Sequence, residues 1–319
     1  MLDILSLIVP VFGLIGLGFA AAKGRVLEPE AARILTMFGY KIAMPALLFR
    51  AMAGVGEIPL SPLWLALTYY SGIAVTWTLT TVVSRYVLGR PAEDAPAMAM
   101  GACFSNGVML GFPVILLALG PEAAAPLAVL ALCETLGLWV IGTLHMGFIA
   151  VDGARTGPRA ILRVLLDVAR NPLIIALAAG LLWRAGGLTL PGAASRFVDL
   201  VGGAAIPVSL FALGMSLVTH GGRGEGASVG LLCLVKLVLY PALAFWLATE
   251  IFHLPRIWAG ALVIYVSMPV GANAFVYAAR YDRALTAISA AVAISTALSV
   301  ITVTVALALL KQQGIVIQP

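Results

Sequence analysis

Residues 105–113 read SNGVMLGFP and interrupt an apolar segment that extends over residues 96–119. Glycine and proline weaken or break a helix, and a break exposes backbone N–H and C=O groups. Lipid cannot satisfy those groups, so a break is tolerated only where it lines a protein-enclosed or watery cavity. A second interruption, SMPVGAN at residues 267–273, lies inside the apolar segment 256–279. Paired interruptions of this kind indicate the binding site of a membrane transporter.

The composition shows which solvent surrounds the chain. Hydrophobic residues make up 62% of the 319 residues, and charged residues make up 10%. Soluble globular proteins have about 45–50% apolar and about 25% charged residues, so most of this chain lies in lipid. The alternation of a membrane β-barrel is absent. We expect an all-α polytopic membrane protein, and we do not expect an enzyme with an aqueous catalytic domain.

Charged residues, glycines and prolines divide the chain into ten candidate transmembrane helices. Their expected limits are 4–22, 32–53, 62–88, 96–119, 124–149, 170–185, 194–218, 227–249, 256–279 and 284–310. With both termini on the outer side, twelve Lys and Arg residues fall in cytoplasmic loops and five lie on the opposite side. This distribution follows the positive-inside rule and predicts that orientation.

An internal repeat appears when the sequence is shifted against itself by 162 residues. The coincident pairs are Pro10 and Pro172, Gly18 and Gly180, Gly24 and Gly186, Pro29 and Pro191, Pro45 and Pro207, Leu48-Phe49 and Leu210-Phe211, and Ser105 and Ser267. Each half holds five candidate helices, and because five is odd the second half enters the membrane from the opposite side. We predict a first repeat at 1–149, a cytoplasmic linker at 150–169 and an inverted second repeat at 170–319.

The two interruptions supply the candidate substrate-binding residues. The N-terminus of a half-helix carries a partial positive charge that suits a carboxylate, and an asparagine amide donates and accepts hydrogen bonds without a charge. The competing interpretation is that proline and glycine merely kink these helices. The candidates are Ser105, Asn106, Gly107, Gly111, Pro113, Met268, Pro269, Gly271 and Asn273.

Three ionisable residues, Lys41, Glu134 and Lys236, lie deep in apolar segments. A lysine at the bilayer centre costs about 2.5–3.5 kcal/mol, so such residues are usually paired, face a cavity or are functional. One interpretation makes Glu134 and Lys236 a charge pair, with Glu134 as a proton carrier. The other makes Lys236 a snorkelling side chain and Glu134 a carboxyl group that stays protonated or bonds a neighbouring helix. Snorkelling is favoured for Lys41.

The sequence carries no pattern of a catalytic, metal or cofactor site. Cys103, Cys133 and Cys233 are scattered in apolar segments without CxxC spacing, which disfavours a disulfide framework or a metal site. The basic residues lie in loops, where they set topology rather than form a nucleic-acid surface. We therefore expect no catalytic residue, no metal, no cofactor and no nucleic-acid partner.

Several stretches resemble the auxin efflux carrier family, which includes bacterial relatives of the plant PIN-FORMED transporters. They are VPVFGLIGLGFAAAKG at 9–24, MPALLFRAM at 44–52, SNGVMLGFPVILLALG at 105–120, KLVLYPALAF at 236–245, MPVGANAFVYAARYD at 268–282 and STALSVITVTVAL at 295–307. Each motif is short, but their order and spacing cover essentially the whole chain.

The resemblance implies ten helices in two inverted repeats, with the fourth and ninth helices crossing at their breaks. Helices one, two, six and seven would form a scaffold, which forms a homodimer, and the others would form a moving transport domain. By similarity, Asn106 and the turn at Pro113 match the substrate-contacting crossover, and the segment around Pro269 matches its second arm. The long cytoplasmic loop of many plant members is absent, which favours a prokaryotic carrier in the inner (plasma) membrane.

The expected function is carriage of a small organic anion, such as a dicarboxylate or an auxin-like monocarboxylate, by elevator-type alternating access. Glu134, Lys236 and Lys41 would couple transport to an ion or balance charge. Two alternatives stay open: a sodium-coupled symporter of the bile-acid type, and a membrane sensor that binds a small ligand. Dependence of flux on sodium rather than on pH would favour the symporter.

Overall fold

The computed structural model describes residues 2–54, 62–149, 166, 169, 170, 172–218 and 225–315. Most of the expected linker at 150–169 lies outside these residues. The described residues are almost entirely helical, and their only β-type pairing is an isolated bridge between Ser105 and Val270. This confirms the all-α class expected from the composition.

The helices fall in two series along the chain. The first series is α1 (Leu2–Lys23), α2 (Pro29–Phe38), α3 (Met44–Ala53), α4 (Pro62–Val82), α5 (Ala95–Cys103), α6 (Phe112–Leu119), α7 (Ala124–Leu132) and α8 (Trp139–Ile149). The second series is α10 (Pro172–Ala185), α11 (Gly192–Gly203), α12 (Ala205–Ser216), α13 (Gly226–Leu234), α14 (Tyr240–Trp246), α15 (Arg256–Ser267), α16 (Ala272–Tyr281) and α17 (Leu285–Gln312).

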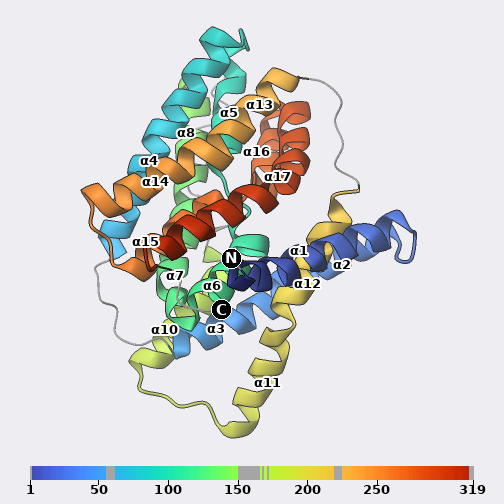
Figure 1. Ribbon diagram of the computed structural model, residues 1–319, viewed down its shortest axis with the longest axis vertical. Coiled ribbons are helices and arrows are strands. Elements are labelled where there is room, and N and C mark those ends of the chain that lie inside the picture. The colour runs from blue at the N-terminus through green and yellow to red at the C-terminus, as the bar shows by residue number, and fades with distance from the viewer. Residues whose placement is uncertain are drawn as a thin grey trace.

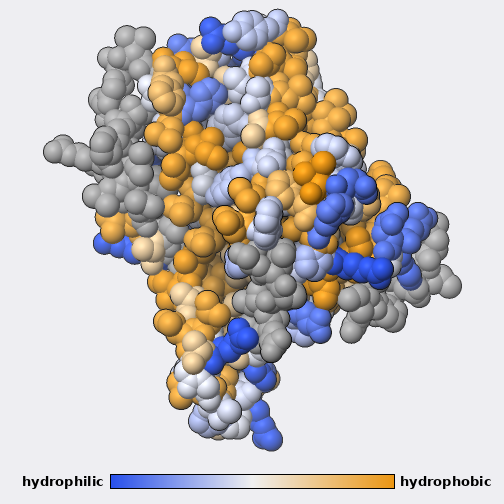
Figure 2. All heavy atoms as spheres, turned by 90° about the vertical axis from the view of Figure 1, so that its left-hand side faces the viewer, coloured by the Kyte–Doolittle hydropathy of each residue, from blue (hydrophilic) through white to orange (hydrophobic). Residues whose placement is uncertain are grey.

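Within the residues that the structure describes, five helices are long and apolar enough to cross a membrane. They are Glu30–Ala53, Pro121–Ile149, Gly192–Ser216, Gly226–Ile251 and Leu285–Gln312. Shorter apolar helices include Gly107–Leu119 and Arg256–Ser267; these two are short because each meets one of the interruptions. Figure 2 shows that hydrophobic residues cover much of one face of the molecule. Exposed apolar surface of this extent is expected where lipid covers the protein.

Several helices contain π-helical turns, in which the backbone bonds skip one residue further than in an α-helix. Three of these turns are η1 (Gly39–Ala43), η6 (Cys133–Leu138) and η8 (Val235–Leu239). They carry Lys41, Glu134 and Lys236 respectively. Each ionisable residue that the sequence places deep in an apolar segment therefore lies on a local widening of its helix, a feature frequent at functional sites.

The helices form two groups, one in the lower part of Figure 1 and one in the upper part. In the lower group, α1 packs along α12 and α3 packs along α10, with α2 and α11 beside them. In the upper group, α4–α8 pack against α13–α17. Contacts between the groups run from α1 to α6 and α17, from α3 and α10 to α7, and from α12 to η4 (Gly107–Gly111).

Two close backbone contacts hold the lower group together. A Cβ atom on Gly18 would lie 2.1 Å from the Phe211 carbonyl oxygen, and one on Gly180 would lie 2.7 Å from the Phe49 carbonyl oxygen. Small residues allow membrane helices to approach this closely. The two contacts are reciprocal under the 162-residue shift, because Gly18 aligns with Gly180 and Phe49 aligns with Phe211.

An ionic cluster joins the N-termini of α5 and α13 in the upper group. The Arg90 guanidinium donates to Asp94 Oδ2 at 2.9 Å, to a Glu225 carboxylate oxygen and to Ser228 Oγ at 3.0 Å. Partial burial acts to lower the pKa of Arg90, but the hydrogen bonds to Glu225 and Asp94 raise it overall. Arg90 therefore stays protonated and fixes the loop before α5 to the beginning of α13.

Candidate substrate site at the helix crossover

The two predicted interruptions lie side by side and form a crossover. The first arm, residues 104–106, follows α5, and the second arm, residues 268–271, follows α15. The Asn106 N–H donates to the Pro269 carbonyl at 2.8 Å, and the Gly271 N–H donates to the Phe104 carbonyl at 3.0 Å. Each arm thus satisfies backbone groups that the other arm's break exposes.

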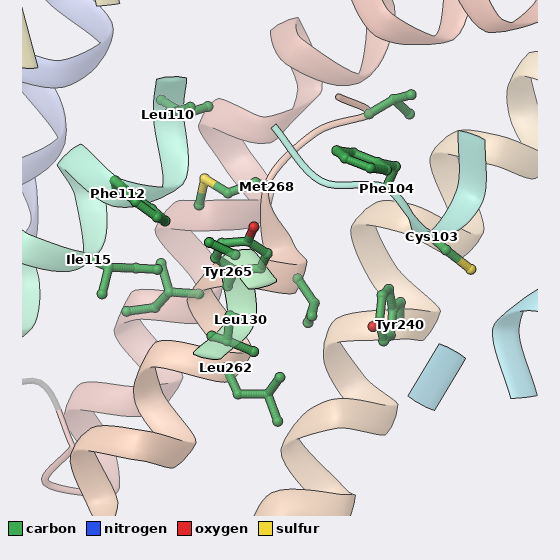
Figure 3. Packing of buried hydrophobic residues seen from close by; sticks show 14 of the residues in the cluster. Cys103, Phe104, Leu110, Phe112, Ile115, Leu130, Tyr240, Leu262, Tyr265 and Met268 are labelled. Atoms are coloured by element: carbon green, nitrogen blue, oxygen red, sulfur yellow. The ribbon is translucent and has the colours of Figure 1, made fainter. Parts of the chain in front are cut away.

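Glycine is required where the arms approach each other. A Cβ atom on Gly271 would lie 2.5 Å from the Ser105 carbonyl oxygen, and one on Gly107 would lie 2.3 Å from the Tyr265 ring. Figure 3 shows Tyr265 and Met268 between the α5 side of the crossover, with Cys103 and Phe104, and the α6 side. The glycines at the interruptions therefore have two roles. They break the helices, and they allow the two arms to cross closely.

Glu134 holds the first arm from η6 and is almost completely buried, with 2% of its surface exposed. Its Oε1 accepts the Ser105 N–H at 2.7 Å, and its Oε2 accepts the Tyr265 hydroxyl at 2.7 Å. The Tyr69 hydroxyl donates to Oε1 at 3.4 Å. Because Tyr265 belongs to α15, this one carboxyl group contacts both broken helices.

Lys236 reaches the same arm from η8, and its side chain is fully buried. Its Nζ donates to Ser105 Oγ at 2.6 Å and to the Cys103 carbonyl at 3.3 Å. The Nζ also lies 5.0 Å from the centre of the Tyr240 ring, a cation–π distance. Among the described residues, no ion pair within 4.0 Å joins Lys236 to Glu134. Ser105 connects them instead, through its hydroxyl and its N–H.

A serine holds the second arm. The Val270 N–H donates to Ser295 Oγ at 3.0 Å, and Ser295 is fully buried on α17. Val270 is the residue bridged to Ser105. The two bridged residues therefore each donate an N–H to a buried side chain, which is a carboxyl group on η6 in one case and a hydroxyl group on α17 in the other.

The remaining predicted residues differ in their exposure. Asn106 is 8% exposed, and its side chain makes no hydrogen bond within the described part of the chain. Asn273 is exposed at the start of α16. Pro113 is buried in the first turn of α6, as its missing N–H favours. Lys41 is exposed on η1 in the lower group, so the structure does not bring it to the crossover.

A cavity of about 500 Å³ lies at the boundary between the two helix groups. Residues from several elements line it, among them Leu47 and Arg50 of α3, Leu116 of α6, Ile206 of α12, and Glu122 just before α7. Figure 1 places α6 between the lower helices and the rest of the upper group. The cavity therefore opens beside the half-helix that continues from the first arm.

The residues that connect Glu134 and Lys236 to the crossover are not among those predicted from the sequence. They are Tyr69, Tyr240, Tyr265 and Ser295. A tyrosine in the middle of an apolar helix is a weak signal, since a buried hydroxyl group needs a partner. Nothing in the spacing tells which residue that partner is. Within the described residues, no cluster of three or more His, Cys, Asp or Glu side chains could hold a metal ion.

An apolar helical bundle that encloses two broken helices and buried charges defines a membrane transporter rather than a soluble enzyme. The model of the family described as "Membrane transport protein" matches residues 3–307. The chain belongs to this family, and the resemblance to the auxin efflux carriers is confirmed. It is therefore an integral membrane protein, and the expectation that it is not an enzyme is confirmed.

Individual relatives align over nearly their whole length. A "Putative malonate transporter" of Rhizobium meliloti (strain 1021) is 28% identical over 312 residues, which cover 98% of this chain and 97% of the relative. An "Uncharacterized transporter" of Methanothermobacter thermautotrophicus is 24% identical, with 92% and 94% covered. An "Uncharacterized transporter MJ1031" of Methanocaldococcus jannaschii is 22% identical, with 94% and 96% covered.

Proposed function

We propose that this protein is a secondary active transporter of a small organic anion, and that its substrate is a short dicarboxylate such as malonate. The observation that carries the proposal is the crossover of the two hydrogen-bonded arms next to Asn106. The relative from Rhizobium meliloti supports the choice of malonate. An auxin-like monocarboxylate is the second candidate substrate and is distinguished by the same experiment.

Each arm is followed by the N-terminus of a helix, and these two N-termini suit the two carboxylate groups of a dicarboxylate. The helix from η4 through α6 begins after Asn106, and α16 begins after Gly271. The first amides of a helix have no partner within it and carry a partial positive charge. A short dicarboxylate has one carboxylate for each of these starts, and Asn106 and Asn273 supply neutral amides beside them.

Movement of one helix group against the other opens the substrate site to each side of the membrane in turn. The scaffold comprises α1–α3 and α10–α12, and the transport domain comprises α4–α8 and α13–α17. The glycine contacts within the lower group support a rigid scaffold, and the packing of η4 on α12 places the first arm at the boundary. The cavity beside α6 supports an access route there. An elevator-type movement of the transport domain is the corresponding mechanism.

The architecture we propose has ten transmembrane helices in two inverted repeats, 1–149 and 170–319, joined by a cytoplasmic linker at 150–169. The reciprocal contacts of Gly18 with Phe211 and of Gly180 with Phe49 support it, because an inverted repeat generates such pairs. Both termini lie on the outer side of the inner membrane. The protein is a homodimer through its scaffold, where exposed apolar residues such as Leu200 are available.

The test is counterflow of radiolabelled acids in proteoliposomes. We expect malonate exchange, and we expect Asn106→Ala to reduce it about 10-fold or more, since a hydrogen bond to a charged group contributes about 1.5–3 kcal/mol. Gln312→Ala, at an exposed position near the end of α17, is the matched control and should exchange normally. Normal exchange by folded Asn106→Ala would place the site elsewhere. Exchange of indole acids but not of malonate would replace the dicarboxylate with a monocarboxylate.

A further inference from the structure

The C-terminal end of α5 is the place in the crossover where a cation is needed. The carbonyl groups at a helix C-terminus carry a partial negative charge, and α5 ends in the protein interior at Cys103. In sodium-coupled carriers with broken helices, carbonyl groups at such ends and in unwound segments coordinate the coupling ion. The group that contacts the Cys103 carbonyl here is the ammonium group of Lys236.

The surroundings of Lys236 match the requirements of a bound cation. Its Nζ donates hydrogen bonds to Ser105 Oγ and to the Cys103 carbonyl oxygen, and it lies 5.0 Å from the centre of the Tyr240 ring. An ammonium group has three donors and no acceptor, so two oxygen atoms and an aromatic ring are suitable surroundings for it. The side chain is completely buried, so bulk solvent does not reach the ammonium group.

One acidic and one basic side chain lie close to the first arm. Glu134 is the carboxyl group that accepts the Ser105 N–H, while Lys236 donates to the hydroxyl of the same residue. The two ionisable groups thus meet on Ser105. A free sodium ion placed beside the Cys103 carbonyl would lie next to the Lys236 ammonium group, and like charges at that distance in a buried site repel strongly.

We infer that Lys236 is a built-in cation that takes the place of a coupling sodium ion at the end of α5, so that the crossover is organised and transport proceeds without sodium. Only the part of this inference that concerns transport rests on the proposed carrier function. Lys236 acts as a positioning residue, because its hydrogen bonds go to Ser105 Oγ and the Cys103 carbonyl and so hold the first arm.

The experiment compares sodium chloride with choline chloride at equal ionic strength, and it measures both the thermal midpoint of purified protein and malonate exchange. We expect both quantities to be the same in the two salts for the wild type. Lys236→Ala should lower the thermal midpoint in choline by roughly 5–10 °C, since it leaves the buried Glu134 carboxyl group without its cation. Part of that loss should return with sodium or ammonium ions, which stabilise the folded state by binding to it.

Two further variants distinguish charge from size. Lys236→Met keeps the length of the side chain and removes its charge, so it should also lower the midpoint. Lys23→Met is the matched control at an exposed lysine and should not change it. The inference is overturned if wild-type stability or exchange requires sodium, or if Lys236→Met equals the wild type. A sodium requirement of the wild type overturns the inference even where a Lys236 variant does not fold.

The two readouts separate this inference from the proposed substrate. The thermal measurement needs no substrate. An absence of malonate exchange, together with a sodium-independent wild-type midpoint and a lowered midpoint of Lys236→Met, would overturn malonate as the substrate and support Lys236 as the built-in cation. Malonate exchange that follows the sodium gradient would support the carrier function and overturn the inference.

Discussion

The two arms of the crossover have the same backbone pairing but different partners. On the first arm the Ser105 N–H is held by the Glu134 carboxyl group, and on the second arm the Val270 N–H is held by the Ser295 hydroxyl group. Lys236 also contacts the first arm. The charged chemistry of the crossover is therefore concentrated on one arm, and the other arm is neutral. We therefore expect substitutions of the side chains that hold the first arm to lower stability more than substitutions of the side chain that holds the second arm.

The largest effect is expected from Glu134→Gln on the charged arm. The variant keeps the shape of the side chain and leaves the buried Lys236 ammonium group uncompensated, which costs about 3–5 kcal/mol. Unfolding in detergent should show this loss, and malonate exchange should disappear. Glu134→Gln with wild-type stability would mean that the carboxyl group is neutral in the folded protein, and the contrast between the arms would then be one of hydrogen bonding alone.

A smaller effect is expected where the arms touch. Gly271→Ala places a Cβ atom 2.5 Å from the Ser105 carbonyl oxygen, so the arms must separate at a cost of about 1–3 kcal/mol. The measurement is again the free energy of unfolding, together with exchange. Gly230→Ala is the control, because nothing beyond the backbone of its own helix lies within 4 Å of its Cβ position. Equal stability of the two variants would contradict the close crossing.

Ser295→Ala tests the neutral arm. It leaves the buried Val270 N–H without an acceptor, and we expect a loss of about 1–2 kcal/mol. The sodium response of the protein should stay as in the wild type, since no charge changes. A new dependence of stability on sodium in this variant would show that the second arm also takes part in cation balance.

The smallest effect on stability is expected for Asn273→Ala. The residue is exposed, so the free energy of unfolding should change by less than about 0.5 kcal/mol. Malonate exchange should nevertheless fall several-fold if the Asn273 amide contacts the substrate. Exchange at the wild-type rate would restrict substrate contact to Asn106 and the first arm.

The crossover could be found in the sequence because rare residue types marked it. Prolines and glycines at 105–113 and 267–273 stand out in apolar sequence, and the structure brings both segments together. The internal repeat at a shift of 162 residues is marked by the same residue types. These signals are local, since they report where a helix cannot continue.

The connection through Ser105 could not be found in this way. Lys41 and Lys236 look alike in sequence, as each lies about nine residues into an apolar segment. The structure exposes Lys41 and buries Lys236 completely. The difference depends on which helices pack around each residue, and hydrophobic periodicity along one helix contains no information about its neighbours. For the same reason, Tyr265 as a partner of Glu134 had no signal in the spacing.

The reciprocal glycine contacts have a consequence for biogenesis. α1 pairs with α12 through Gly18 and Gly214, and α3 pairs with α10 through Gly180. α1 and α3 are therefore synthesised before α10 and α12. Their contact faces are exposed to lipid until the second half of the chain is inserted. Neither half can complete the lower group alone. The two halves, synthesised as separate chains, should assemble with each other in the membrane, while each alone should remain open to degradation.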